Sequence, residues 1–290
     1  MLTAEQVDFY AVNGYLMIPD ALSVKEVAEL RANVDEIVAG AVKLTGHTDI
    51  YDLEDGHTQA APKVRRIKAP HKHFDYFKGL VRHPGIMATL AALLGPNIRL
   101  HGAKLNMKSA GYGAPVEWHQ DWAFYPHTND DVVATGILLD DCVEENGPML
   151  MIPGSHRGRL HDHHSEGKFC GAITGELNQI AFDKAVMMTG RAGSMSIHHA
   201  RTLHGSAQNT SAKQRRLLLF EFTAADAWPL MGVPDFAEFN SRIVLGSPTV
   251  EPRMRPAPVR MPLPPASAQG SIYENQRGAK VRYFGKQAAE

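Results

Sequence analysis

The sequence is poor in cysteine and has no excess of charge of either sign. Its 290 residues include two cysteines, and the formal net charge is -1. Cys142 and Cys170 are too few for a disulfide framework, so we expect reduced thiols and a cytoplasmic protein. The balanced charge argues against a nucleic-acid partner. No apolar run reaches ~18 residues and the first residues lack the pattern of a signal peptide, so we expect no membrane association.

Apolar residues are plentiful enough to build a large core. Hydrophobic residues account for 44% of the chain and charged residues for 21%, which is typical of a globular protein. We expect one domain over residues 1–290, because single β-domains often reach this length. It would consist of a helical part to about residue 95, a β-rich core over about 96–225 and a C-terminal extension over about 226–290. The sequence does not indicate an oligomeric state.

The N-terminal part carries clear helix signals. Thr3 and Gln6 form a capping-box pattern, which predicts a helix over residues 3–12. Ser23 is the expected cap of a second helix, which has one apolar stripe. The other expectations for this part are a strand over 15–19, a polar loop over 41–72 that could cover a site, and two helices within 73–94 that are broken near His83-Pro84-Gly85.

Short apolar runs separated by glycine, proline and asparagine dominate the chain after residue 95. Many short strands with such turns, behind a helical N-terminal third, are typical of a β-sandwich or jelly roll buttressed by helices. A His- and Gly-rich insertion is expected over 156–181, and a proline-rich segment over 247–268 would wrap the surface. Strands are expected over 98–108, 132–139, 149–152, 185–188, 194–198 and 215–223.

A His-x-Asp pair and a distant histidine form the most informative pattern. In a strand, residues two apart point to the same face, so His119 and Asp121 can bind one metal while Gln120 faces away. His204 would supply a third ligand from another strand. Two histidines and one carboxylate are the ligands of mononuclear non-haem iron(II) sites, which keep positions open for a co-substrate and O₂.

Arg215 suits the far carboxylate of an organic acid that is chelated to such a metal. A buried carboxylate without a cation is costly, and arginine makes planar bidentate contacts with carboxylates. A turn follows His204, so Arg215 would return on the neighbouring strand. Ser206 shares the face of His204 and could donate a hydrogen bond. Leu217 and Leu219 would line a dry pocket on the face of Arg215.

Other interpretations of these residues remain open. An isolated His-x-Asp pair is usually a surface feature, and we expect His161, Asp162 and His163 to lie in a solvated loop. A jelly-roll protein that binds a small molecule without catalysis could have the same fold. A zinc hydrolase could use the same metal ligands, but it would have no task for Arg215.

Three segments resemble the phytanoyl-CoA dioxygenase family of iron- and 2-oxoglutarate-dependent oxygenases. The first is Trp118-His119-Gln120-Asp121-Trp122, the second runs from Glu144 to His156, and the third is His204-Gly205-Ser206 with Arg215 after it. The opening helices leading into Asn13-Gly14-Tyr15-Leu16 are also similar, so the resemblance covers residues from about 5 to 225. The turn residues of the second segment and His156 we expect to be structural.

The resemblance implies a mainly β fold with flanking helices, namely a double-stranded β-helix of the jelly-roll or cupin type. It assigns binding of Fe²⁺ to His119, Asp121 and His204, and it implies 2-oxoglutarate and O₂ as co-substrates. It assigns the distal carboxylate of 2-oxoglutarate to Arg215, with Ser206 beside it. On the strand before the metal motif, it assigns co-substrate contacts to Asn106 and Lys104. Ile137 aligns with a pocket-lining position that is often aromatic in relatives.

The resemblance also implies the type of reaction. Related halogenases carry a small residue in place of Asp121, so its presence favours hydroxylation of a C–H bond in a small organic substrate, with release of succinate and CO₂. The same ligands serve desaturation, epimerisation and ring formation, which stay open as alternatives. The residues that we expect at the substrate are Trp122, Phe124 and Tyr125, with Trp118 and Trp228 as further aromatic candidates. We expect satisfied polar residues at the barrel rim for His198, His199 and Arg201, although one of them could bind an anionic group of the substrate.

Overall fold

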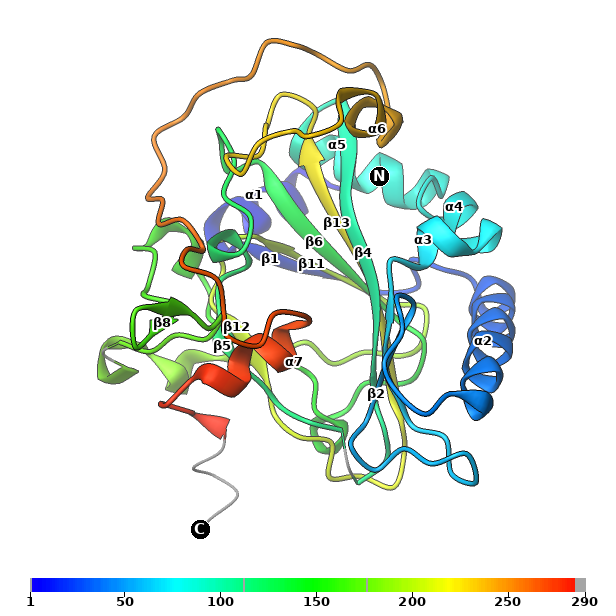
Figure 1. Ribbon diagram of the computed structural model, residues 1–290. Coiled ribbons are helices and arrows are strands. Elements are labelled where there is room, and N and C mark those ends of the chain that lie inside the picture. Colours follow the sequence, from blue (N-terminus) through cyan, green and yellow to red (C-terminus); the bar gives the residue numbers. More distant parts are fainter. Residues whose placement is uncertain (1, 112, 176, 285–290) are drawn as a thin grey trace.

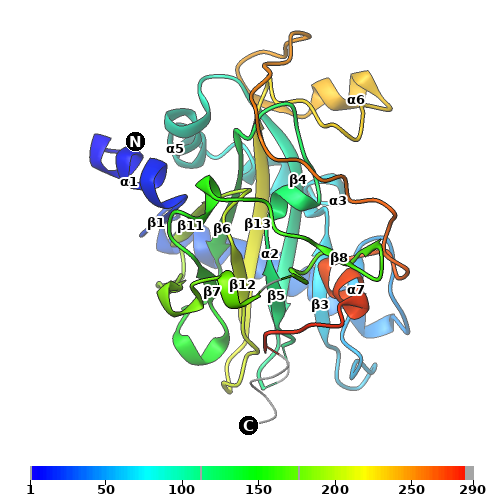
Figure 2. The same cartoon turned by 90° about the vertical axis from the view of Figure 1, so that its left-hand side faces the viewer.

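Two antiparallel sheets face each other in the computed structural model, which describes residues 2–111, 113–175 and 177–284. Met1 and residues 285–290 of the expected C-terminal extension lie outside the described residues. The arrangement is the expected double-stranded β-helix (Figures 1 and 2). The larger sheet consists, in spatial order, of β1 (Tyr15–Ile18), β11 (Met195–His199), β6 (Val132–Leu138), β13 (Arg215–Ala224), β4 (Ile98–Lys108), β3 (Val64–Lys68) and β2 (Tyr51–Leu53), with β14 (Ile243–Leu245) paired to β4.

The smaller sheet carries the histidines of the metal pattern. Its strand β12 pairs with β5 so that His204 stands opposite His119. The expected strand boundaries after residue 95 agree with the structure to within one residue. His119 and His204 lie on strands, as expected, in the short strands β5 and β12, whose bounds the sequence did not indicate. The order of the smaller sheet is β10 (Val186–Met187), β7 (Met149–Met151), β12 (His204–Ser206) and β5 (Val116–His119), and a separate ribbon joins β8 (His164–Ser165) and β9 (Lys168–Phe169).

The N-terminal helices form as the capping patterns predict. Thr3 and Gln6 make the reciprocal capping box of α1, and Ser23 makes the same box with Glu26 at the start of α2. Figure 1 shows the helices from α2 to α5 on the side of the larger sheet that faces away from the smaller sheet. The bounds are α1 (Ala4–Asn13), α2 (Val24–Ala39), α3 (Pro70–His73), α4 (Asp75–Leu80) and α5 (Pro84–Leu94).

Strand β13 separates the hydrophobic core from the site because its side chains alternate between two buried faces. Leu218, Phe220 and Phe222 pack in the large core together with the helices. Each fully buried side chain of this size stabilises the fold by roughly 1.5–3 kcal/mol. Leu217 and Leu219 point to the opposite face and line a cavity between the sheets, as expected.

The segment 41–72 is not a loop, contrary to the expectation. It contains β2 and β3, and β3 extends the larger sheet by pairing with β4. The sequence did not predict β3 as a strand because three of its five residues, Arg65, Arg66 and Lys68, are charged. Arg66 is neutralised by Asp52 at 2.9 Å, and Arg65 forms an ion pair with Glu274. Tertiary partners therefore allow a strand where the local sequence is polar.

The C-terminal extension runs over the open side of the two sheets. As expected, residues 247–268 have no helix or strand, and Figure 1 shows this segment in orange as a long surface strap. The short helix α6 (Phe236–Ser241) precedes the strap and α7 (Ile272–Asn275) follows it. In the part of the chain that the structure describes, no helix combines the length and the apolar run that a bilayer crossing requires.

Candidate metal and co-substrate site

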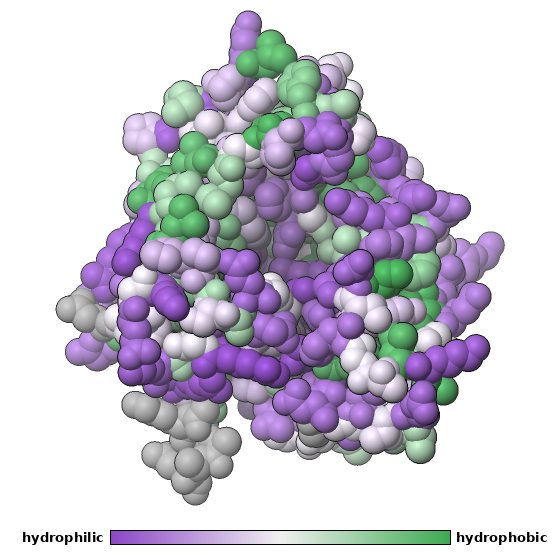
Figure 3. Space-filling view, viewed as in Figure 1, coloured by the Kyte–Doolittle hydropathy of each residue, from purple (hydrophilic) through white to green (hydrophobic). Residues whose placement is uncertain are grey.

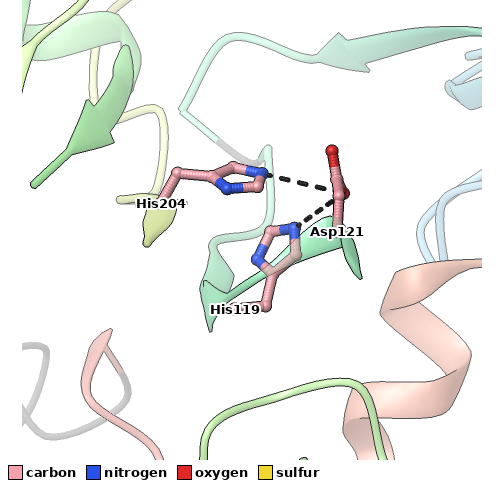
Figure 4. A group of neighbouring side chains, drawn as sticks. All are labelled: His119, Asp121 and His204. Atoms are coloured by element: carbon pink, nitrogen blue, oxygen red, sulfur yellow. Dashed lines mark ion pairs between the residues drawn. The ribbon is translucent and has the colours of Figure 1, made fainter. Parts of the chain in front are cut away.

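Three side chains converge at the mouth of the space between the sheets (Figure 4). His119, Asp121 and His204 each offer a ligand atom, and these atoms lie within 4.8 Å of one another. The Nε2 atoms of His119 and His204 lie 3.6 and 3.8 Å from Asp121 Oδ1. Asp121 does not continue the strand as expected, because β5 ends at His119 and Asp121 opens a 3₁₀ turn. The turn nevertheless points the carboxylate at both imidazoles.

Gln120, between the two ligands, faces away and holds the turn in place. It is fully buried, its amide donates to the carbonyls of Arg159 and Arg201, and its backbone N–H donates to His163 Nε2 at 2.9 Å. His163 is only 1% exposed, so the expectation that it lies in a solvated loop is wrong. The insertion 156–181 folds inward here because its imidazole satisfies a buried N–H that would otherwise lack a partner.

Both imidazoles have their tautomer fixed by the backbone. His119 Nδ1 lies 2.8 Å from the carbonyl of Glu117, and His204 Nδ1 lies 2.9 Å from the carbonyl of Thr202. A carbonyl can only accept, so each Nδ1 carries the proton and each Nε2 presents a lone pair. Two nitrogen lone pairs and a carboxylate oxygen therefore face one another in a buried place. That arrangement is favourable only with a cation between them, so the residues fit a divalent metal.

The charges around Asp121 keep its carboxylate ionised. Burial raises the pKa of Asp121, but a proton on the neighbouring imidazoles of His204, His119 and His198 outweighs burial and holds that pKa well below its usual range. A bound metal cation would take the place of that proton. His198 is 1% exposed and its Nε2 lies 3.1 Å from Asp121 Oδ2. Burial and the two neighbouring imidazoles lower the pKa of His204, which keeps it neutral as a metal ligand must be.

A cationic end lies deep in the cavity. Arg215 and Lys108 are 3% and 1% exposed and are paired across β13 and β4. Arg215 donates to the carbonyl of Gly147 at 2.7 Å, and Lys108 donates to Ser206 Oγ at 2.9 Å. Gly147 has the left-handed φ of 73°, which glycine adopts without strain. Burial and the charge of Arg215 hold the pKa of Lys108 well below its usual value.

The cationic end of the cavity, at Arg215 and Lys108, is suited to bind the carboxylate of a ligand. Neither Arg215 nor Lys108 has an acidic partner among the described residues, and Arg215 Nε has no hydrogen-bond partner there. A buried cation without a counter-ion is costly. Arg215 was expected on the strand next to His204, but it lies on the opposite sheet. Arg215 and Ser206 therefore approach the cavity from two sides.

The middle of the cavity carries the other two expected co-substrate residues. Asn106 Oδ1 is buried without a hydrogen-bond partner in the described chain. Lys104 Nζ lies 2.7 Å from Glu221 Oε1, so the two side chains form an ion pair. Burial lowers the pKa of Lys104, but the carboxylates of Glu221 and Asp121 outweigh it, so the pKa is raised. Gly102 makes room for this pair, because a Cβ there would lie 2.4 Å from Glu221 Oε2.

Polar and apolar side chains from both sheets line the cavity. Its free space is about 530 Å³ when its open mouth is included. Figure 3 shows a hollow near the middle of this face, with hydrophilic side chains around much of its rim. The lining residues are Lys104, Asn106, Lys108, Val116, His119, Asp121, Ala134, Met149, His198, His204, Gly205, Ser206, Arg215, Leu217, Leu219, Ile272 and Tyr273.

Helix α7 closes one side of this cavity, which the sequence did not indicate. Ile272 and Tyr273 line the cavity, and the guanidinium of Arg65 lies 5.0 Å from the centre of the Tyr273 ring. The side-chain amide of Gln276 accepts from the N–H of Glu117 and donates to its carbonyl. Strand β5 is the edge of its sheet, so Gln276 takes the place of a neighbouring strand. The only sequence signal was Ser271 followed by Glu274, a capping box.

The three expected substrate residues lie in different places. Trp122 is fully buried, is not among the residues that line the cavity, and donates its indole N–H to the Pro258 carbonyl in the strap. The Phe124 ring packs edge-on against His119, with 5.9 Å between ring centres. The centre of the Tyr125 ring lies 4.5 Å from that of His101, and the two ring planes are tilted by 41°. Burial and the carboxylate of Asp121 raise the pKa of Tyr125 well above its usual value.

The remaining candidates pack in the core or make polar contacts away from the cavity. Ile137 was aligned with a pocket wall, but it packs in the helix-covered core, and Ala134 on the same strand lines the cavity instead. Trp118 packs against Phe182, and Trp228 packs against Phe239. His156 lies 3.3 Å from the carbonyl of Ala11, while His199 and Arg201 contact Asp130 at 3.8 and 2.9 Å.

Comparisons with known proteins agree with this geometry. The family model for phytanoyl-CoA dioxygenase (PhyH) matches residues 10–217. A relative from Stutzerimonas stutzeri, named a probable alpha-ketoglutarate-dependent hypophosphite dioxygenase, is 42% identical over 97% of this chain and 99% of its own length. The L-proline trans-4-hydroxylase of Streptomyces griseoviridis is 31% identical over 76% of this chain and 86% of its own.

Solved structures share the fold. The carbocyclase SnoK from nogalamycin biosynthesis, a non-haem alpha-ketoglutarate-dependent enzyme, has a TM-score of 0.63 and 27% identity, and the match covers 86% of this chain and 93% of that one. The iron-bound EctD of S. alaskensis has a TM-score of 0.69 at 24% identity, with coverage of 89% and 88%. The chain therefore belongs to the phytanoyl-CoA dioxygenase family of iron(II)- and 2-oxoglutarate-dependent oxygenases.

Proposed function

We propose that the protein hydroxylates a C–H bond of a small organic substrate while 2-oxoglutarate is converted to succinate and CO₂. His119, Asp121 and His204 would hold Fe²⁺. The observation that carries the proposal is the convergence of three ligand atoms within 4.8 Å, beside a cavity that also contains an unpaired arginine. A simple binding protein has no need of open metal positions next to a carboxylate receptor.

Arg215 would bind the distal carboxylate of 2-oxoglutarate. Lys108 would add a second hydrogen-bond donor, and a bound carboxylate would favour its protonated form. Ser206 would donate its hydroxyl to the same carboxylate, since its Oγ already accepts from Lys108. Asn106 lies between this end and the metal residues, where its unpartnered Oδ1 faces the cavity. Lys104 is two residues further along β4 and pairs with Glu221, so it is better placed to contact the primary substrate.

The bound metal supplies the activation of O₂, which protein side chains cannot provide. The chain supplies position and exclusion of water. Asp121 stays ionised among three imidazoles, and the backbone holds the His119 and His204 nitrogens toward the metal. Leu217, Leu219 and helix α7 cover the site from water. A dry site strengthens the attraction between the metal and its ligands.

A second candidate substrate class follows from the relative that is named a hypophosphite dioxygenase. Hypophosphite has P–H bonds, and its oxidation uses the same cofactors. Desaturation, epimerisation and ring formation are further outcomes of the same site, and the carbocyclase SnoK has this fold. We place C–H hydroxylation first because the apolar side chains of Ala134, Leu217 and Leu219 line the cavity beside the metal residues, which suits an organic substrate better than a bare ion.

The test is a substrate screen with the full chain, Fe²⁺, 2-oxoglutarate and O₂. Organic acids, amino acids and hypophosphite are compared by succinate release and by mass spectrometry of the product. Hydroxylation predicts one added oxygen atom in an organic product. Succinate formed only with hypophosphite would move the function to the second class. If no substrate raises succinate above the background, and if added Zn²⁺ instead activates hydrolysis, the oxygenase proposal is wrong.

We also propose that the enzyme acts in the cytoplasm on a diffusible small molecule. Cys142 and Cys170 are both free and buried, as in a reducing compartment. The measurement is the distribution of the tagged full chain between cell fractions. Recovery in a secreted or envelope fraction would contradict the proposal.

A further inference from the structure

A second cavity lies at the other end of β4 and β13, away from Arg215. Its free space is about 620 Å³ when its open mouth is included. Figure 1 shows α6 over the ends of these two strands, and residues from α6 and the segment before it complete the wall. No acidic residue is among the described residues that line it, which are Arg99, His101, Tyr125, His127, Thr223, Pro229, Met231, Gly232, Val233, Pro234, Phe239 and Arg242.

Arg99 is a buried cation without a counter-ion. It is 1% exposed, and its guanidinium lies 3.7 Å from the centre of the Phe239 ring. Its Nη1 donates to the carbonyl of Ala225 at 2.7 Å, but Nε and Nη2 have no partner in the described chain. Burial and the charge of Arg242 lower the pKa of Arg99 to about 10. An uncompensated buried guanidinium costs several kcal/mol, so its retention calls for an anion.

Thr223 offers a second donor to the same place. It is 1% exposed, and its Oγ1 has no hydrogen-bond partner among the described residues. Thr223 and Arg99 are directly paired across β13 and β4, so both side chains point to one face. Buried polar groups are normally paired. Two unpaired donors on one wall form a built site for an oxyanion. Arg242 also lines the cavity, but it is already paired with Glu238.

This cavity reaches toward the turn that carries Asp121. Tyr125, which lines the cavity, comes directly after that turn. Its ring contacts the ring of His101, which also lines the cavity, with 4.5 Å between the ring centres. Arg99 is five residues from Lys104 on β4, which is roughly 16 Å along a strand. Lys104 lines the first cavity together with the metal residues. A molecule that reaches from Arg99 into the first cavity is therefore elongated.

We propose that this second cavity binds the anionic end of the primary substrate, a carboxylate, phosphate or phosphonate held by Arg99 and Thr223. The inference rests on the proposed function and narrows it to organic acids that are long enough to reach from Arg99 to the metal residues. A bare hypophosphite ion bound at the metal leaves Arg99 without its anion.

Inorganic phosphate is the probe for the site itself. The full chain is loaded with Mn²⁺ and saturating 2-oxoglutarate, so that Arg215 is occupied, and phosphate is titrated at constant ionic strength. We expect a saturable rise in Tm for the wild type, at least tenfold weaker binding in Arg99→Met, and weaker binding in Thr223→Val. The exposed Arg191→Met is the matched control and should bind as the wild type does.

Several results would overturn the anion site. These are no saturable stabilisation of the wild type, or equal phosphate binding in the wild type, Arg99→Met and Thr223→Val. If Arg99→Met does not fold, Arg99→Lys replaces it, since a lysine keeps the charge but loses the guanidinium fork. The phosphate measurement needs no turnover, so its failure is distinct from failure of the oxygenase proposal, which succinate release reports.

A second arm separates a substrate group from a free anion. Aliphatic acids and phosphonates of increasing length are compared with their neutral amides by succinate release. We expect turnover only with the charged forms, inhibition by inorganic phosphate, and a raised KM for the acid in Arg99→Met with an unchanged requirement for 2-oxoglutarate. Phosphate that binds at Arg99 without inhibiting turnover would assign the cavity to a free anion and refute the substrate role.

Discussion

At the scale of single residues, the metal site depends on acceptor atoms that would repel one another without a cation. The Nε2 atoms of His119 and His204 and the Asp121 carboxylate face one another because Nδ1 of each imidazole is held by a backbone carbonyl. The folded chain holds these acceptor atoms close together at a cost in electrostatic energy, and a bound metal cation would offset this cost. Arg215 and Arg99 are likewise buried cations without an acidic partner among the described residues, and a bound anion would stabilise each of them.

Asp121→Ala removes the only charged ligand. We expect loss of turnover by at least a thousandfold, with the fold retained, because the side chain belongs to a turn and not to the large core. Succinate release and circular dichroism measure the two effects. His161→Ala in the neighbouring insertion is the control and should keep activity. Activity retained in Asp121→Ala would remove this residue from the ligand set.

Arg215→Met tests whether Arg215 binds the distal carboxylate of 2-oxoglutarate. Loss of a buried charge-assisted contact costs on the order of 2–4 kcal/mol, so we expect the 2-oxoglutarate requirement to rise about a hundredfold. Arg216→Met is the matched control, because Arg216 is adjacent but pairs with Asp140 and Asp35. The control should lose stability without a change in this requirement. An unchanged requirement in Arg215→Met would place the co-substrate elsewhere.

Glu54 gives a prediction for pH. Burial raises the pKa of Glu54 to about 7, from an ordinary value of 4.5. The folded state then holds the proton more tightly than the unfolded state, so stability from this group is complete below pH 4.5 and is lost as the pH rises to 7. Glu54→Gln should therefore gain on the order of 3 kcal/mol relative to wild type between pH 4.5 and 8. Urea unfolding at both pH values measures this, and a constant difference would contradict it.

At the scale of elements, polar contacts attach α7 and the turn after it to β5, the strand that carries His119. Gln276 pairs with both backbone groups of Glu117, and the carboxylate of Glu117 accepts from the N–H groups of Tyr283 and Phe284. The short helix has little core of its own, since Tyr273 is its one buried residue. Its position over the cavity therefore depends on these hydrogen bonds.

Gln276→Ala should loosen α7. It leaves buried backbone groups of Glu117 unpaired, which costs about 1–3 kcal/mol, and it exposes the co-substrate end to water. We expect a lower Tm together with a several-fold higher 2-oxoglutarate requirement. The exposed Gln208→Ala is the control and should change neither. A drop in Tm alone would show that α7 stabilises the fold without closing the site.

At the scale of the whole molecule, two sheets bring together groups that bind different ligands. The smaller sheet and its turn carry the metal residues, while the larger sheet carries Arg215 and Arg99. Ligands that contact both sheets should stabilise the fold as a unit. At a hundred times Kd, a bound ligand adds about 2.7 kcal/mol.

Thermal unfolding with and without metal tests whether ligands at this site stabilise the whole fold. We expect Mn²⁺ and 2-oxoglutarate together to raise the Tm by roughly 5–10 °C, and a chelator to reverse the shift. Asp121→Ala should lose the effect of the metal, and Arg215→Met should lose most of the effect of 2-oxoglutarate. Equal shifts in wild type and Asp121→Ala would mean that the metal binds at another place.

The sequence alone determined the repeating and local features. Capping boxes, the alternation along β13 and the turn residues define most helices and strands without reference to distant partners, and the His-x-Asp pattern with His204 and Arg215 indicated the site. The number and shortness of the strands predicted a β-sandwich or jelly roll, because such strands bury their apolar faces by stacking in two sheets. The resemblance to the family narrowed this prediction to a double-stranded β-helix.

Only the tertiary structure decided which polar residues are buried and what they face. Strand β3, the inward position of His163, the cavity-lining Lys108, the closure by α7 and the unpaired Arg99 were not predicted. Each depends on a partner more than 30 residues away in the sequence. A charged or polar residue has the same local pattern whether it is solvated or buried, and its environment is set by the neighbours that folding brings to it.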